Sequence, residues 1–417
     1  MIKETYKDLN YVKMMKKIMW PTGFWPGEAL GEKVPLLVKW HKIQMTLQNI
    51  VGFIGQVNYI VVFFDQIPFL DAGQLYITAS LTFTMMARCC LISLQKYQSI
   101  LKLFFTEFHL INHKHSSGYE AEVFTKINKF SYFCTVYHMA MILIVPPAFN
   151  ALPIYTSYKA GAFRSRSLEG IDVELAVYYH YPGFNCLDYF YILSFVNIYF
   201  TFIGCVAVFC VDLLLALIVF QIIGHIQILK HNLENLPRPK QETVVLVPGR
   251  NENVSMNWYD DGENKYINNV IVEMIKHHKF IIRFVDEVSS FFGPILGLNY
   301  MFHLVNQCVL LLACIRCEQD ALVRNLCLLG GSMGNLLVTS ITFEVVGAYS
   351  EKLIDAVYGM PWECMNVSNR KYLMLFLSRV QDPIRVTTMG VVSVGVQTMG
   401  AILRTSFSYC SFLLTIE

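Results

Sequence analysis

Small and hydroxyl-bearing side chains recur at helical spacing in the last apolar segment of this chain, residues 385–410. Steps of four and three along the segment pass through Thr387, Val391, Val394, Thr398, Ala401, Thr405 and Ser408. Polar residues in a membrane span face protein or water rather than lipid, and rings of small apolar side chains can gate a pore by dewetting. We therefore expect Val391, Val394 and Thr398 to line an ion pathway. Close packing of helices through small residues is the alternative.

Charged residues inside apolar segments are costly and need a partner or a route to water. Arg88 lies near one end of its segment, so its long side chain can reach the membrane surface. Pairing with Glu344, at similar depth in another segment, is the alternative. Asp212 ends its segment, and we expect it at the interface. The other segments contain apolar or isolated polar positions, so a water-facing wall should come from residues 385–410.

Residue patterns of enzymes and of nucleic-acid or metal sites are missing from the sequence. It has no nucleotide-binding loop, no G-x-S-x-G motif and no pair of carboxylates at catalytic spacing, so we predict no catalytic residue, no cofactor and no nucleic-acid partner. The pairs His113 with His115 and His277 with His278 lie in lysine-rich connections without a matching second pair, which argues against a metal. The C-x-x-C at Cys314 has no redox setting around it.

The elements that carry these residues are predicted to be seven membrane-spanning helices. Hydrophobic residues make up 54% and charged residues 15% of the 417 residues, which is more apolar than ordinary soluble domains. A spanning helix needs about 20 apolar residues. Seven segments qualify, and they lie near residues 44–64, 74–95, 131–152, 190–213, 291–313, 327–347 and 385–410.

Lysines and arginines are distributed unequally between the two sides of the predicted membrane spans. Of the 33 lysines and arginines, 26 lie on the side of the N-terminus, five lie on the other side, and Arg88 and Arg404 lie within spans. The positive-inside rule then places the N-terminus in the cytosol and the C-terminus outside the cell. This orientation is the reverse of that of a G-protein-coupled receptor.

The connections between spans divide the chain into five parts. We expect a cytosolic segment over 1–43, four helices over 44–223, a cytosolic extension over 224–287, two helices with a cytosolic anchor over 288–383, and a pore helix over 384–417. The outer loop 153–188 is aromatic and should fold over the protein instead of exposing an apolar patch. Cys186 in this loop can form a disulfide with Cys314, Cys317 or Cys327.

The cytosolic extension continues the fourth helix, because the apolar run from Tyr191 to Gly224 is longer than one crossing needs. Residues 237–261 contain three prolines and are expected to be a flexible insertion. Helical periodicity from Tyr266 to Phe284 predicts an amphipathic helix. The extension is either a packed anchor or a tether for another protein, and the absence of a docking motif favours packing.

The C-terminal third resembles the insect odorant receptor family. The residues Gly347, Ser350, Leu353, Ala356, Tyr358 and Trp362 resemble the family's pattern after the sixth span. The segment Arg379-Val380-Gln381-Asp382-Pro383 is similar to its R-x-Q-x-P element. Arg404-Thr405-Ser406-Phe407-Ser408-Tyr409 is similar to its K-T-S-Y-S-Y ending, with Arg404 and Phe407 as departures. The insertion and the run Glu263-Asn264-Lys265-Tyr266 resemble moth-type receptors, including the pheromone-responsive branch.

The resemblance implies a subunit of a ligand-gated, non-selective cation channel that assembles with a common co-receptor as a heterotetramer. It implies a pore lined by the seventh helices and a subunit interface at the cytosolic ends, for which the candidates are Tyr358, Trp362, Gln381 and Pro383. It also implies a plasma-membrane location in sensory dendrites. The family has no motif for its ligand pocket, so depth and chemistry supply the candidates. Because any bundle must fill its interior, such residues are more often packing residues than ligand contacts. The candidates are Tyr76, Ser80, Phe83, Tyr137, Met141, Val145, Phe195, Tyr199 and Leu336.

Such a pocket, with hydroxyl groups as its only polar groups, suits a small neutral volatile ligand. The alternatives are a G-protein-coupled receptor, a gustatory-type channel and a transporter. A G-protein-coupled receptor is opposed by the predicted orientation and by the absence of Asp-Arg-Tyr and Asn-Pro-x-x-Tyr motifs. A gustatory-type channel is opposed because the last helix lacks the T-Y-x5-Q-F element of those relatives. A transporter would show internal repeats, and this sequence shows none.

Overall fold

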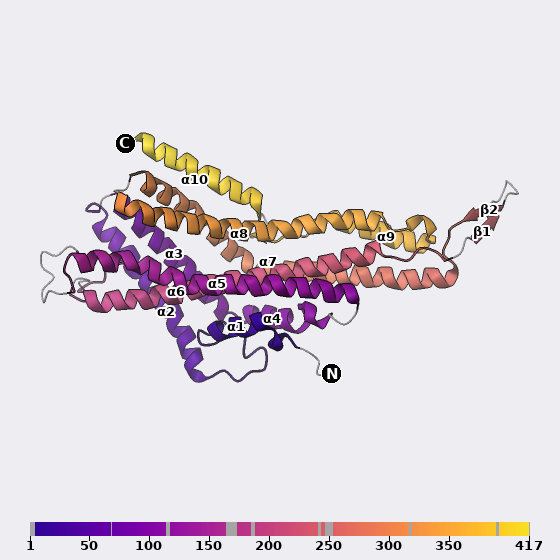
Figure 1. The fold of residues 1–417 in the computed structure, drawn as a ribbon, viewed down its shortest axis with the longest axis horizontal. Coiled ribbons are helices and arrows are strands. Elements are labelled where there is room, and N and C mark those ends of the chain that lie inside the picture. Colours follow the sequence, from indigo (N-terminus) through magenta and orange to yellow (C-terminus); the bar gives the residue numbers. More distant parts are fainter. Residues whose placement is uncertain are drawn as a thin grey trace.

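The computed structural model describes residues 5–67, 69–113, 117–163, 173–184, 188–240, 243–246, 253–316, 319–388 and 392–416. Within them, seven helices of 21 residues or more form one elongated bundle (Figure 1), which confirms the predicted all-α membrane fold. They are α2 (Leu36–Phe63), α3 (Phe69–Ser93), α5 (Gly118–Lys159), α6 (Phe190–Glu234), α7 (Asp261–Arg316), α8 (Gln319–Tyr358) and α10 (Val396–Ile416). The first six are long and apolar enough to cross a membrane, and α10 carries more polar residues.

Shorter elements precede or connect these helices. They are η1 (Tyr6–Asp8), α1 (Asn10–Met19), α4 (Gln95–Leu103), the π-helical turn η2 (Phe104–Phe108), η3 (Leu110–Asn112), η4 (Trp362–Cys364) and α9 (Val367–Val380). In Figure 1, α1 and α4 lie along the side of the bundle, and α9 lies toward the end that carries β1 (Thr243–Leu246) and β2 (Asn253–Met256).

Helix α6 forms the centre of the bundle. Its 45 residues extend about 68 Å at 1.5 Å per residue, whereas a hydrocarbon core is about 30 Å thick. The helix is therefore longer than one crossing needs, and its continuation into the cytosol stays a prediction. Of its most apolar 18-residue stretch, 89% is buried. A helix that is apolar on all sides belongs in the interior.

Helix α7 is equally continuous: the predicted amphipathic segment Tyr266–Phe284 and the fifth span are parts of one helix of 56 residues. Ile267 and Ile271 are buried on its inner face. Asn369 at the start of α9 donates from Nδ2 to the Asn264 carbonyl at 2.9 Å, and Asn268 donates to Asn369 Oδ1 at 2.9 Å. These contacts within the chain support a packed anchor.

Two stretches contain strands that the sequence did not predict. Residues expected to be a flexible insertion include an antiparallel pair, β1 (Thr243–Leu246) with β2 (Asn253–Met256), in register Thr243 to Met256. This ribbon projects from the far end of the bundle (Figure 1). The predicted last helix begins at Val396 instead of residue 385, because a second pair, β3 (Thr387–Thr388) with β4 (Val392–Ser393), precedes it. Valine and threonine, which dominate this stretch, favour strands.

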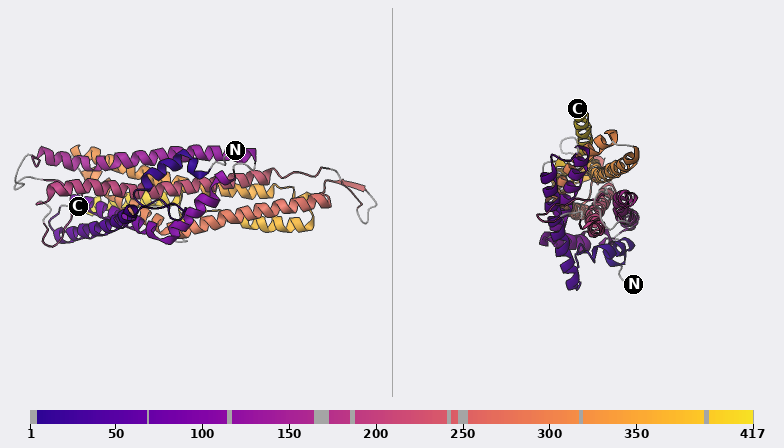
Figure 2. Two further views of the ribbon diagram at one scale, coloured as in Figure 1. Left: turned by 90° about the horizontal axis from the view of Figure 1, so that it is seen from below. Right: turned by 90° about the vertical axis from the view of Figure 1, so that its left-hand side faces the viewer.

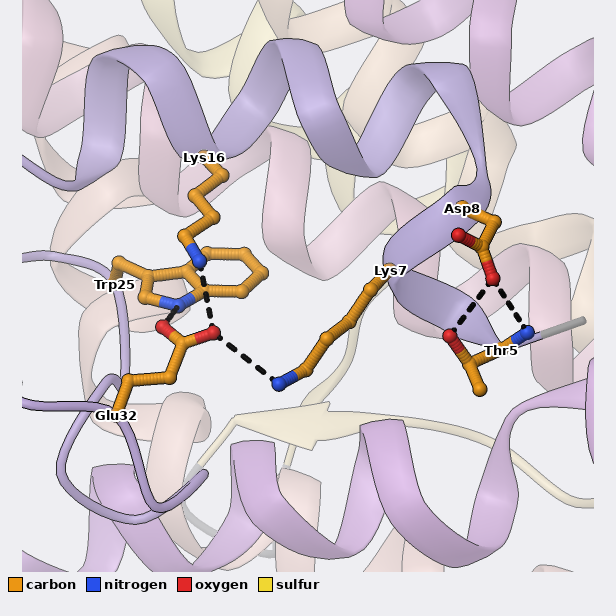
Figure 3. Close-up of polar contacts among 6 residues, drawn as sticks. All are labelled: Thr5, Lys7, Asp8, Lys16, Trp25 and Glu32. Atoms are coloured by element: carbon orange, nitrogen blue, oxygen red, sulfur yellow. Dashed lines mark hydrogen bonds and ion pairs between the residues drawn. The ribbon is translucent and has the colours of Figure 1, made fainter.

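The N-terminal segment is part of the folded core. Helix α1 buries Tyr11, Met15 and Met19 on one face. Figure 3 shows how Glu32 closes the following loop: Lys16 Nζ lies 2.8 Å from Glu32 Oε1, and Trp25 donates its indole N–H to Glu32 Oε2 at 2.9 Å. The segment is therefore held against the start of α2. In the end-on view of Figure 2, α10 lies at the edge of the bundle opposite the N-terminus.

Candidate functional site

The nine candidate pocket residues are spread over several faces of the helices. Phe195 is 73% exposed and faces away from the bundle, whereas Leu336 is 1% exposed and lies in the core. Tyr199 turns toward α2, where its hydroxyl lies 3.3 Å from His41 Nε2 and 3.3 Å from Gln44 Oε1. Ser80 bonds within its own helix, to the Ile77 carbonyl. Four others are half-buried or at the margin of exposure: Tyr76, Tyr137, Met141 and Val145. The roles of all these residues remain predictions.

A cavity of about 480 Å³ lies between α2 and the outer part of α6, and its lining includes none of the nine residues. Phe83 is close by on the other side of α2, where its ring centroid lies 5.4 Å from that of Phe53. Trp40 and Leu47 line the cavity from α2, and Leu193 and Phe200 line it from α6.

The aromatic outer loop folds down onto α2, as expected. His180 donates its backbone N–H to the Gly55 carbonyl at 2.9 Å, and Tyr181 donates its hydroxyl to the Val51 carbonyl at 2.7 Å. A Cβ at Gly55 would lie 2.5 Å from the Tyr181 ring carbon that bears the hydroxyl, so only glycine permits this approach. Cys186 lies outside the described residues, and so does its expected disulfide.

Arg88 forms a buried ion pair with Asp212, so both expectations about Arg88 were wrong. Its Nη1 lies 2.9 Å from Asp212 Oδ1, and the side chains are 2% and 8% exposed. The guanidinium also donates to the Val208 carbonyl and to Asn299 Oδ1. Asp212 is likewise an interior residue instead of an interfacial one. The pair connects α3, α6 and α7, where helix packing leaves no route for Arg88 to the membrane surface.

Glu344, the alternative partner of Arg88, caps α10 instead. Its carboxylate accepts the Val396 backbone N–H at 3.1 Å. Negative charge at a helix N-terminus is favourable because the first backbone N–H groups have no partner within the helix. The neighbouring Gly395 leaves room for it, since a Cβ there would collide with Glu344 Oε2.

A polar face on α7 continues from Asn299 and was not expected from the sequence. His303, Asn306 and Gln307 follow Asn299 at helical spacing, and each of these three side chains is at most 4% exposed. Asn306 donates to Ser332 Oγ of α8 at 2.6 Å, and Gln307 does so at 3.2 Å. His303 Nε2 and Gln307 Oε1 have no hydrogen-bond partner within the described part of the chain. The interior therefore contains amide and imidazole groups in addition to hydroxyls.

Helix α10 packs against α7 by one face and leaves the other open. Ile402, Ser406 and Cys410 are buried, and Ser406 donates to the Leu304 carbonyl of α7 at 3.2 Å. The exposed positions in the first half of the helix carry small or polar residues, Gln397, Gly400, Ala401 and Arg404. Toward its C-terminal end the exposed positions include Ser408 and also the large apolar side chains of Phe407, Tyr409 and Phe412. Thr398 lies on this helix at the border of the open face.

The other two pore candidates, Val391 and Val394, precede Val396, the first residue of that helix. Val394 precedes it and is 3% exposed, with its N–H bonded to the Val386 carbonyl. Its burial inside the chain argues against a pore-lining position. Val391 lies outside the described residues. The continuous helical stripe that starts at Thr387 is therefore corrected to one that starts at Val396.

Histidines gather where α6 and α7 pack against η2, in the part of the bundle that we expect outside the membrane. His225 Nε2 lies 2.6 Å from the Phe108 carbonyl, so this nitrogen carries the proton and donates. His277 Nε2 lies 2.9 Å from His225 Nδ1 and must be the donor in that pair. Burial lowers the pKa of His277 to about 4 and holds the pKa of His225 well below its usual value. This part of the anchor is therefore built from neutral imidazoles.

The candidate interface residues are accessible in a single chain. Tyr358 is 68% exposed and Trp362 is 46% exposed, and Gln381 is exposed while Pro383 is half-buried. Exposed aromatic side chains at one end of a bundle are suited to subunit contacts, which remain a prediction here.

The geometry is that of a seven-helix membrane bundle with a polar interior and an open last helix. The profile of the 7tm odorant receptor family matches residues 69–407. The chain belongs to this family. Odorant receptor 10 of Aedes albopictus is 23% identical over 164 residues, a match that spans 36% of this chain and 40% of that receptor.

Solved odorant receptor structures share the fold over almost the full length. The insect olfactory receptor OR5 from Machilis hrabei superposes with a TM-score of 0.72, at 14% identity over 98% of both chains. The same receptor in complex with eugenol gives a TM-score of 0.70 at 12% identity, again over 98% of both chains. The resemblance to odorant receptors that the C-terminal motifs indicated is confirmed, and the family is one of receptors instead of enzymes.

Proposed function

We propose that this odorant receptor is the ligand-binding subunit of a ligand-gated, non-selective cation channel that opens on binding a small neutral volatile. The observation that carries the proposal is the first half of α10, whose exposed Gln397, Gly400, Ala401 and Arg404 include polar and charged groups that would be costly against lipid. Family membership supports the ligand class, since the Machilis hrabei relative has been solved with eugenol.

Assembly with a common co-receptor in the plasma membrane of sensory dendrites is part of the proposal. In a heterotetramer, the open faces of the last helices would surround a central pathway, and this chain would supply part of the wall. Tyr358 and Trp362 would contribute to the subunit contacts, together with Gln381 and Pro383.

The polar contacts of α7 support a mechanism of opening. Helix α7 is bonded to α3 through Asn299, to α8 through Asn306 and to α10 through the Leu304 carbonyl. A ligand that shifts α3, α6 or α8 would move α7, and α7 would move α10. Buried networks of this kind have discrete arrangements, as a gate requires.

Cysteine substitution on α10 tests the pore. We would express Thr398→Cys or Ala401→Cys with the co-receptor and apply a small charged thiol reagent while ligand is present. Modification should change conductance or ion preference without abolishing the current, because the co-receptor supplies the remaining wall. Ile402→Cys on the buried face is the matched control. The proposal would be contradicted if the reagent left the current unchanged at all three positions.

A further inference from the structure

The cavity between α2 and α6 is a lateral groove. Its floor is formed by residues of α2: Trp40, Ile43, Leu47 and Val51. Val196 and Phe200 of α6 line the facing side. Its volume of about 480 Å³ is within the range of small-molecule sites. Leu47 is 56% exposed and Val51 is 53% exposed, so the groove is open along the outer side of the bundle.

One end of the groove is closed by the aromatic loop. The Tyr181 bond to Val51 and the His180 bond to Gly55 fix the loop on α2. A Cβ added at Gly52 would meet the Tyr179 ring at 3.7 Å, which is ordinary contact distance. The groove therefore ends at Tyr179 and Tyr181, and a linear occupant has to enter from the opposite end.

The opposite end carries the features of a membrane surface. Trp40 is 62% exposed, and tryptophan prefers the headgroup level of a bilayer. Gln44 donates to Gln48 at 2.6 Å, and Tyr199 connects Gln44 to His41. These groups suit the ester and phosphate region of a phospholipid.

The groove extends along α2. Trp40 and Gly52 are 12 residues apart on this helix, which corresponds to about 18 Å, so the groove is long enough for much of an extended acyl chain. We propose that the groove holds one acyl chain of a membrane phospholipid, with its headgroup beside Trp40 and its methyl end under Tyr181. This lipid would be retained by the receptor, in contrast to the exchanging lipids around it.

Photolabelling after removal of bulk lipid tests the proposal. The full-length chain would be reconstituted in vesicles of phosphatidylcholine that carries a diazirine in the middle of one acyl chain, and then exchanged into lipid-free detergent and irradiated. We expect adducts on Leu47, Val51 or Val196, and about one retained phospholipid per chain by native mass spectrometry. Adducts spread evenly over exposed positions of α2, or no retained lipid, would overturn the proposal.

Filling the groove gives the matched comparison. Gly52→Trp should remove both the adducts and the retained lipid, whereas Val61→Trp, on a part of α2 that does not line the groove, should leave both unchanged. Gly52→Leu is the smaller version in case the indole disturbs folding, and size-exclusion profiles report folding for every variant. If labelling survives in a folded Gly52→Leu or Gly52→Trp protein, the groove does not hold the lipid. Labelling that excess neutral volatile removes would assign the groove to the odorant and would also overturn the proposal.

Discussion

Removing one partner of the buried ion pair between Arg88 and Asp212 should strongly destabilise the bundle. Removing one partner of a buried pair leaves an uncompensated charge, at a cost of about 3–5 kcal/mol. Asp212→Asn keeps the shape of the side chain and removes only its charge, so Arg88 would keep its contacts with Val208 and Asn299 but lose its counter-ion. We expect the unfolding equilibrium to shift by about two to four powers of ten.

The free energy of unfolding can be measured by titrating the folded chain with sodium dodecyl sulfate in mixed micelles. Arg88→Met alone should cost a similar amount, and the double variant should cost clearly less than the sum of the two, because it buries no unpaired charge. The pair of Arg385 with Glu351 is the control. Its atoms are also 2.9 Å apart, but its side chains are 46% and 54% exposed, so Glu351→Gln should cost at most about 1 kcal/mol.

Equal costs for Asp212→Asn and Glu351→Gln would refute this reasoning, since the two pairs differ in burial and not in distance. Additive costs in the double variant would show that Arg88 and Asp212 do not interact.

Three other expectations concern the anchor and the orientation of the chain. Trp362→Ala should reduce recovery of the complex with the co-receptor in pull-down and surface-labelling assays while the ranking of ligands stays the same; a changed ranking with normal assembly would place Trp362 elsewhere. The lowered pKa of His277 means that stability is fully present above the unfolded pKa of about 6.5 and is lost as pH falls toward 4, by about 1 kcal/mol at pH 5.5. His277→Gln, which keeps a donor for His225, should reduce the fall in melting temperature between pH 7.4 and 5.5, while His225 and His278, whose pKa values are also lowered, retain their share. An unchanged slope would exclude His277 as a contributor. The sequons at Asn253 and Asn366 should stay unglycosylated because we place both in the cytosol, and a glycan at either site, seen as a glycosidase-sensitive mass shift, would reverse the orientation.

Apolar periodicity predicted the long helices because each of them must bury one face or meet lipid along its length. It also predicted the extension of α6, since Tyr191 to Gly224 is longer than a membrane crossing. The start of α10 was missed because Thr387, Thr388 and Val392 are apolar or small and fit a helical stripe, while their strand preference and Gly395 indicate a break.

The polar interior was predictable only in part. Asn299, His303 and Asn306 recur at helical spacing, so their shared face could have been found from the sequence. The partner of Arg88 could not, because Asp212 lies 124 positions away and only the packing of α3 against α6 brings them together. The pocket candidates were chosen by depth in the membrane, and depth does not specify the direction in which a side chain such as Phe195 points.

Recording from excised membrane patches tests the central claim most directly. Patches from cells that express this chain with an odorant co-receptor would be held inside-out in solution without nucleotides and exposed to a panel of neutral volatiles. We predict that at least one volatile evokes a current carried by both sodium and potassium ions, and that cells expressing the co-receptor alone do not respond to it. A response that appears only when GTP is added would contradict the account, because the chain would then signal through another protein and would not form part of a channel.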